Sequence, residues 1–287
     1  VGYLSMDANT TGTNNVGVGD NTLGANTTAV NNTAVGSQAL AANTTGHSNT
    51  AIGAAAASTV TTGDENTAVG HGALQSVGTD NNGNTAIGVD VMKASGYDAS
   101  YNTGVGYNAL LSSTTGTGLT AIGNQALDAN TTGSNNTGVG AAALGANTTG
   151  AGNTTLGFSA GSAITTGSTN TAIGYQALVD TTPTTTGDNN VGIGTNVRTK
   201  SNSESGSIII GHDIESYAVN SFTFGTASQG FVTNQFSANA TWSRPSDERL
   251  KQDIQNDTLG LNFINDLRTV TYRWKGNNEI PENFTGY

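Results

Sequence analysis

The three histidines are the side chains in the repetitive part of the chain whose chemistry suits a bound ion or a proton switch. His47, His71 and His212 each follow a glycine. If copies of the chain assembled around a threefold axis, one histidine and its two symmetry mates would be able to surround a metal or an anion. The histidines are isolated in the sequence, however, and occur in only three repeat units. We therefore favour a surface or packing role and predict no metal site.

Pairs of threonines are the second group with a recurrent spacing. Stacked in register, these pairs would form a hydroxyl ladder of the kind that ice-binding solenoids use, whereas the competing interpretation is that Thr and Asn satisfy backbone groups in turns. No Walker sequence, His-Glu-x-x-His motif, EF-hand loop or recurring pair of carboxylates is present. We predict neither catalytic activity nor a cofactor in the repetitive part. The pairs include Thr27-Thr28, Thr44-Thr45, Thr131-Thr132 and Thr148-Thr149.

A glycine that returns at a nearly fixed interval organises most of the chain. Nine of the twelve gaps between these glycines are 17 residues, two are 18 and one is 20. A short fixed period over more than two hundred residues is typical of one structural unit stacked on itself. The repeat glycines are Gly2, Gly19, Gly36, Gly53, Gly70, Gly88, Gly106, Gly123, Gly140, Gly157, Gly174, Gly194 and Gly211.

One repeat unit, residues 37–53 (SQALAANTTGHSNTAIG), contains a strand signal, a weaker apolar segment and a turn. Thr-Ala-Ile is partly β-branched and bounded by turn residues, and Asn-Thr-Thr-Gly is turn chemistry. We expect Leu40 and Ile52 to be buried and to stack with their equivalents into two aliphatic ladders. The sequence therefore predicts an all-β fold, a repetitive parallel β-roll or β-solenoid of about 17 residues per coil. At the usual strand spacing it would be roughly 60 Å long.

Composition and charge exclude several partners. Residues 1–197 hold one base, Lys93, against ten acids, so a row of phosphates or an anionic membrane surface would not be attracted. No run of 18 apolar residues exists, and we expect no membrane insertion. The absence of cysteine excludes disulfides and thiolate zinc sites. A thin rod has a high ratio of surface to volume, so we expect a homo-oligomer.

A 14-residue spacing after Gly211 carries a first resemblance. The motif Asn220-Ser221-Phe222-Thr223-Phe224-Gly225 is similar to the head repeats of trimeric autotransporter adhesins of the YadA-like type. Those heads are left-handed parallel β-rolls formed by three chains side by side, and the 17-residue coils look like a longer version, also familiar from phage fibres. The resemblance covers residues 1–225 and implies a homotrimer.

The chain changes character in its last third, where charge and aromatic residues increase. Residues 226–245 indicate a short β neck, and Pro245 disfavours helix at the residue before it. Ser246 is a plausible helix N-cap, followed by acidic residues that suit a first turn. Two amphipathic stretches and an alternating strand pattern follow, so residues 246–287 are predicted to be an α+β segment.

This last segment carries a second, more specific resemblance. Ser-Asp-x-Arg-Leu-Lys, Gly-Leu-x-Phe-Ile and Leu-Arg-x-Val-x-Tyr-x-Trp closely resemble the opening of the self-cleaving intramolecular chaperone of phage tailspikes and tail fibres, including endosialidases. That module assists trimerisation and severs itself with a serine–lysine dyad, which the resemblance places at Ser246 and Lys251. On one regular helix these side chains would lie about 140° apart, so Ser246 must lie off the helix end, or the dyad must form between chains. Alternatively, Ser246 only caps a helix and Lys251 is a solvated charge.

Together these observations predict a phage tail fibre or tailspike that attaches a virion to a host and lies at the virion tail or another extracellular surface. The expected partners are two further copies of the chain, a bacterial cell-surface glycan or protein, and other virion tail proteins. Within these residues, the one enzymatic activity expected is self-cleavage by an intact C-terminal module. Three alternatives remain open: a bacterial trimeric autotransporter-type adhesin, an enzyme-bearing tailspike whose catalytic domain lies upstream of Val1, and an ice-binding β-solenoid.

Overall fold

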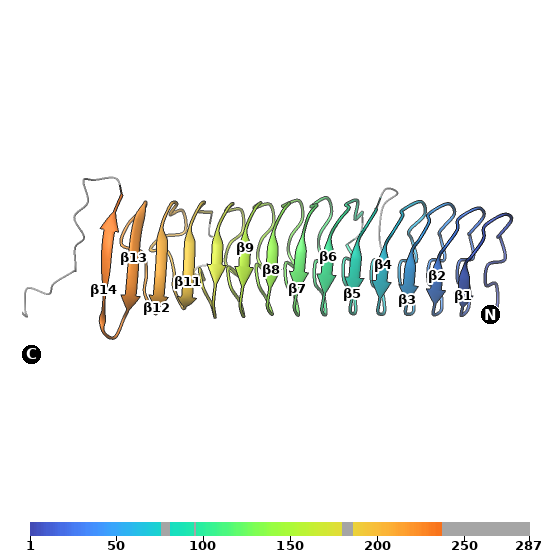
Figure 1. Ribbon diagram of the computed structural model, residues 1–287, viewed down its shortest axis with the longest axis horizontal. Coiled ribbons are helices and arrows are strands. Elements are labelled where there is room, and N and C mark those ends of the chain that lie inside the picture. Colours follow the sequence, from blue (N-terminus) through green and yellow to red (C-terminus); the bar gives the residue numbers. More distant parts are fainter. Residues whose placement is uncertain (76–80, 95, 180–185, 237–287) are drawn as a thin grey trace, which may run out of the picture. The chain divides into compact units, whose positions relative to one another are not determined.

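The computed structural model describes residues 1–75, 81–94, 96–179 and 186–236. The chain divides into two units, Val1–Pro245 and Ser246–Tyr287, and the second lies outside the described residues. Within the described part of the first unit, fourteen strands form a single sheet in which each strand pairs with the next in sequence (Figure 1). The prediction of an all-β solenoid is confirmed.

The first ten strands are three residues long, and the last four have five or six residues. Their bounds are β1 (Val16–Val18), β2 (Thr33–Val35), β3 (Thr50–Ile52), β4 (Thr67–Val69), β5 (Thr85–Ile87), β6 (Thr103–Val105), β7 (Thr120–Ile122), β8 (Thr137–Val139), β9 (Thr154–Leu156), β10 (Thr171–Ile173), β11 (Val191–Thr195), β12 (Ile208–His212), β13 (Ser221–Thr226) and β14 (Gly230–Gln235).

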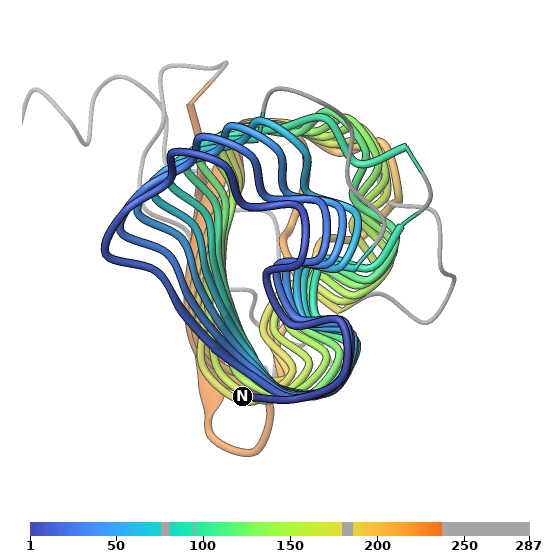
Figure 2. The ribbon, with the colours of Figure 1, turned by 90° about the vertical axis from the view of Figure 1, so that its right-hand side faces the viewer.

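The sequence period sets the register of the sheet. Strands β1 to β13 pair in parallel, and each residue of the repeat pairs with its equivalent in the next coil, as Thr33 does with Thr50. Seen along the axis, successive coils follow nearly the same bent outline (Figure 2). The strand β14 reverses direction and pairs antiparallel with β13. Since a parallel stack exposes an unpaired edge at its end, this hairpin changes the last edge of the solenoid from parallel to antiparallel.

The repeat glycine is required by close contact between coils as well as by its backbone conformation. Gly53 has a φ of 138°, a region that side-chain-bearing residues rarely adopt. A Cβ placed on Gly53 would lie 2.4 Å from the carbonyl oxygen of Gly70 in the next coil. A Cβ and a carbonyl oxygen that are not bonded do not come this close, so the chain can keep its coil spacing only with glycine at this position.

One of the two predicted aliphatic ladders is in the core, and the other is outside. Leu40 is completely buried, as are its equivalents Leu74, Leu110 and Leu127. Ile52, in contrast, is 42% exposed, so the prediction that it is buried was wrong. The strand residue that points inward is the alanine between Thr and Ile.

The residue at this middle strand position is alanine or glycine in most coils. In β8 the position is Gly138, where an added Cβ would lie 3.4 Å from the side chain of Leu127. In β11 it is Gly192, and a Cβ there would lie 2.6 Å from Leu178. At Gly192 the leucine of the opposite wall leaves no space for a Cβ, whereas Thr155 in β9 and Ile209 in β12 occupy the equivalent position and are buried. Since side chains alternate along a strand, the larger Val or Ile must point to the outside.

A ladder of buried asparagines provides the polar part of the core. Asn49 accepts hydrogen bonds at Oδ1 from the backbone N–H (2.9 Å) and from Nδ2 (3.1 Å) of Asn66, and its own Nδ2 donates to the Gly63 carbonyl at 2.7 Å. Each rung thus satisfies turn groups of its neighbours that water cannot reach. The ladder consists of Asn32, Asn49, Asn66, Asn84, Asn102, Asn136, Asn153, Asn170 and Asn190, all buried.

A buried tyrosine is inserted beside this ladder in one of the 18-residue coils. The Tyr97 hydroxyl donates to Oδ1 of Asn84 at 3.0 Å and accepts from Nδ2 of Asn102 at 2.7 Å. Burial raises the pKa of the Tyr97 hydroxyl far above its usual value, although the hydrogen bond from Asn102 lowers it in part.

Candidate functional site

Ser246 and Lys251, the two predicted catalytic residues, lie outside the described residues. Their roles remain predictions that rest on the sequence resemblance.

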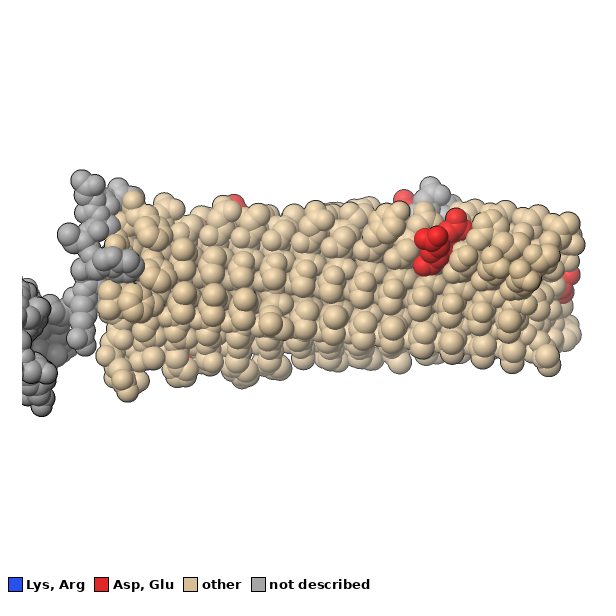
Figure 3. All heavy atoms as spheres, in the orientation of Figure 1, with Lys and Arg blue, Asp and Glu red and all other residues tan. Residues whose placement is uncertain are grey.

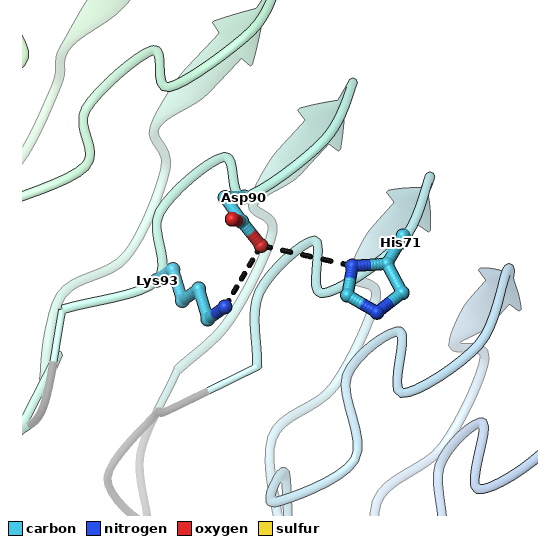
Figure 4. Close-up of polar contacts among 3 residues, drawn as sticks. All are labelled: His71, Asp90 and Lys93. Atoms are coloured by element: carbon cyan, nitrogen blue, oxygen red, sulfur yellow. Dashed lines mark hydrogen bonds and ion pairs between the residues drawn. The ribbon is translucent and has the colours of Figure 1, made fainter.

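His71 belongs to a small charged cluster on the surface of the solenoid (Figure 4). Its Nδ1 lies 3.9 Å from Oδ1 of Asp90, and Nζ of Lys93 lies 2.9 Å from the same oxygen. The side chain of His71 is 63% exposed. An exposed ion pair of this kind contributes little to stability, typically below about 1 kcal/mol. The cluster links two coils and offers one carboxylate, which is too few ligands for a metal site.

The other two histidines also contact neighbouring residues. His47 accepts a hydrogen bond at Nδ1 from the backbone N–H of Val30 at 3.1 Å. The backbone N–H of His47 donates to Oδ1 of Asp64 at 2.6 Å. Nδ1 of His212 lies 3.8 Å from Oδ2 of Asp213. Among the described residues, no three potential metal ligands gather in one place.

The two threonines of each pair have different environments. The first threonine donates its hydroxyl to a carbonyl of the next coil, as Thr44 does to Thr61 at 3.1 Å and Thr131 to Thr148 at 2.9 Å. The second threonine of the pair, such as Thr45 or Thr132, is exposed. A large part of the predicted hydroxyl ladder therefore satisfies the backbone, and one threonine per pair faces solvent.

The outer face of the sheet carries a row of exposed or partly exposed apolar side chains. We call the residues just before the repeat glycines and Gly225 the aliphatic row, because it places one Val, Ile or Leu on almost every strand. Ile52, Ile122 and Leu156 in this row are 42%, 40% and 51% exposed. The row consists of Val18, Val35, Ile52, Val69, Ile87, Val105, Ile122, Val139, Leu156, Ile173, Ile193, Ile210 and Phe224.

Threonine flanks the aliphatic row on the same face for most of its length. From β2 to β10 the residue two positions before each member is a threonine, which we call the threonine row. The orientation in Figure 3 shows a face without visible lysine or arginine and with only small acidic areas. Exposed apolar patches of this extent, along a whole domain, mark interaction surfaces. The aliphatic row was not predicted from the sequence, because these side chains were expected to lie in the core.

A cavity lies beside buried Glu204, near the C-terminal end of the solenoid. Its volume is about 10 Å³, enough for one water molecule. Glu204 accepts hydrogen bonds from the Ser207 hydroxyl at 2.6 Å and from the Lys200 N–H at 3.1 Å. The cavity is too small to hold a substrate or cofactor, and local groups use both oxygens of the carboxylate.

The comparison with known families concerns the second unit. Residues 246–285 match the peptidase S74 family, described as the chaperone of endosialidase. The matched stretch begins at Ser246 and includes Lys251. The chaperone segment expected from the sequence is thereby supported at the family level. No curated protein and no solved structure matches the chain.

The chain therefore combines a β-solenoid with a stretch that matches the endosialidase chaperone, an arrangement consistent with a tailspike-type fibre. In the described ranges, no helix is long and apolar enough to cross a bilayer.

Proposed function

We propose that this chain is part of a homotrimeric phage tail fibre or tailspike, in which the solenoid is the shaft or head that attaches to a host. The observation that carries the proposal is the match of residues 246–285 to the endosialidase chaperone, directly after a solenoid. The C-terminal module assists trimerisation and then cleaves the chain. The proposed location is the virion tail, in contact with other tail proteins.

The outer face of the sheet supports a trimer. The aliphatic row would remain in water on a single chain, and three copies around a common axis would bury three such rows against one another. Each coil would then stack on the next within a chain and contact equivalent coils in two others. A stiff trimer that presents the same surface three times binds its target with avidity. Its target is proposed to be a bacterial cell-surface glycan or protein.

The proposed cleavage uses Ser246 as the nucleophile and Lys251 as the base. The neutral amine of Lys251 takes the proton from Ser246 Oγ, which attacks the carbonyl carbon of a peptide bond next to it. The bond to nitrogen breaks, the new amine receives the proton, and water hydrolyses the ester that remains on Ser246. Lysine can act in this way only when its pKa is lowered, for example by burial during trimer assembly.

Intact mass spectrometry of the expressed chain tests this proposal. We expect the wild type to give two fragments separated next to Ser246, and Ser246→Ala and Lys251→Met to retain the mass of 28.8 kDa. The matched controls are Ser243→Ala and Lys275→Met, which change the same residue types nearby and should leave cleavage intact. If the wild type and every variant stay whole, self-cleavage by this chain is excluded, and the trimeric adhesin becomes the better hypothesis.

A further inference from the structure

The outer face of the sheet changes composition between β10 and β11. At the position that belongs to the threonine row in β2 to β10, β11 has Val191 and β12 has Ile208, followed by Phe222 in β13. The aliphatic row itself continues there as Ile193, Ile210 and Phe224. Both outward positions are therefore apolar on the last three parallel strands, as they are in β1 with Val16 and Val18, whereas β2 to β10 alternate Thr with Val, Ile or Leu.

The side chains of this region form one contiguous surface. Val191 pairs with Ile208, and Ile193 pairs with Ile210, so these four lie on adjacent strands with matching register. Ile193 is 36% exposed, Ile210 is 40% exposed, and the other two are partly exposed. Phe222 and Phe224 continue the same face on β13, with ring centroids 5.4 Å apart. We call Val191, Ile193, Ile208 and Ile210, with the two phenylalanines, the C-terminal apolar patch.

We propose that the C-terminal apolar patch is the principal docking surface for further copies of this chain, so that the fibre associates most strongly at this end. This inference rests on the proposed trimer and specifies which part of the solenoid contributes most to the association of the chains. Hydrophobic association scales with the apolar area removed from water. Valine and isoleucine bury more such area than threonine and leave no hydroxyl to desolvate. Each coil of the patch therefore contributes more to association than a coil with the Thr-Ala-Ile sequence.

A second copy of the chain fits this patch better than an unrelated protein. The patch is continuous with the aliphatic row, which runs in the same register over the remaining strands. Copies that run parallel would therefore align patch with patch and row with row over the whole solenoid. An unrelated partner would need an apolar surface of the same length and the same repeat spacing.

Matched substitutions in the aliphatic row test the inference. Ile193→Thr with Ile210→Thr changes two residues that are 36% and 40% exposed, and Ile52→Thr with Ile87→Thr makes the same change at residues that are 42% and 39% exposed. Threonine is compatible with a strand, and the side chains point outward, so the coils should persist. Sedimentation of the full-length chain over a dilution series measures association, and circular dichroism measures the fold.

We expect the first pair of substitutions to weaken association at least tenfold and the second pair less than threefold. A further variant, Val191→Thr with Ile208→Thr, gives the patch the residues of the other coils and should also weaken association about tenfold. The reverse change, Thr50→Val with Thr67→Ile, should strengthen it, which keeps the test decisive if a patch variant unfolds.

Two outcomes would contradict the inference, and they differ from each other. A wild-type trimer that both Ile→Thr pairs weaken equally would show uniform association along the shaft and overturn the inference alone. A wild type that sediments as a monomer at every concentration would overturn the trimer itself, and the inference with it.

Discussion

At the scale of single residues, the sequence allows a correct prediction where one interaction in the structure permits only one residue type. The repeat glycines are an example, because the approach of Gly53 to Gly70 excludes any side chain and so leaves a regular mark in the sequence. The orientation of Ile52 was not readable in the same way. Ala51 and Ile52 are both apolar, so their types alone do not show which of them points inward; in the structure Ala51 is buried and Ile52 is 42% exposed.

Tyr97 allows a prediction at the same scale. The buried hydroxyl resists ionisation in the folded chain, because its pKa is raised, whereas in the unfolded chain it ionises near pH 10. The stabilisation is therefore complete below about pH 10 and is lost progressively as the pH rises beyond it. Between pH 10 and 12, the unfolding free energy should fall about 1.4 kcal/mol per pH unit less steeply in Tyr97→Phe than in the wild type.

Chemical denaturation at several alkaline pH values measures this slope. The control is Tyr101→Phe, because Tyr101 is four residues away and 73% exposed, and its substitution should leave the slope unchanged. Equal slopes in the wild type and Tyr97→Phe would mean that the hydroxyl of Tyr97 reaches water.

At the scale of the elements, the positions of the strands could be predicted from the sequence. The asparagine ladder that links successive coils by hydrogen bonds could not. Asparagine was assigned to turns because its side chain bonds local backbone groups. In Asn49 the side chain instead bonds groups 14 and 17 residues away, because the next coil brings them within reach. Contacts between coils arise only after stacking, so a single repeat cannot reveal them.

The hydrogen bonds of the asparagine ladder predict that removal of one buried asparagine side chain lowers the free energy of unfolding by more than its size suggests. Asn49→Ala removes the acceptor for the Asn66 N–H and the donor for the Gly63 carbonyl, and both groups stay buried. Each unsatisfied group costs about 1–3 kcal/mol, so we expect the two together to lower the free energy of unfolding by about 2–6 kcal/mol.

Equilibrium denaturation of both variants and the wild type gives this value. Asn124→Ala is the matched control, because Asn124 is exposed and the equivalent position of the next coil is already an alanine, Ala141. We expect its effect to stay within about 0.5 kcal/mol. A loss of the same small size in Asn49→Ala would show that water reaches the ladder.

At the scale of the whole molecule, the solenoid should tolerate the loss of a complete coil. Deletion of residues 124–140 joins Gly123 to Ala141 and lets β7 pair with β9, since each coil contacts only its neighbours. The shortened chain should remain folded, with the β-sheet circular dichroism of the parent, and should still associate.

Deletion of half a coil, residues 124–131, is the control. It brings turn residues opposite strand residues and removes Leu127 from the leucine ladder together with the buried Asn130, so the chain should unfold at a lower temperature or aggregate. If both deletions were equally harmless, the coil would not be the unit of folding.

The direction of the strands has a mechanical consequence for a fibre. The strands run across the rod, so the hydrogen bonds between coils point along its axis. A pull on the two ends therefore loads these bonds in series: every coil carries the full tension, and the coil with the fewest bonds yields first. Bending instead compresses one wall and stretches the other. A single chain is thus as strong in tension as its weakest coil, and in the proposed trimer three chains side by side would share the load at each level.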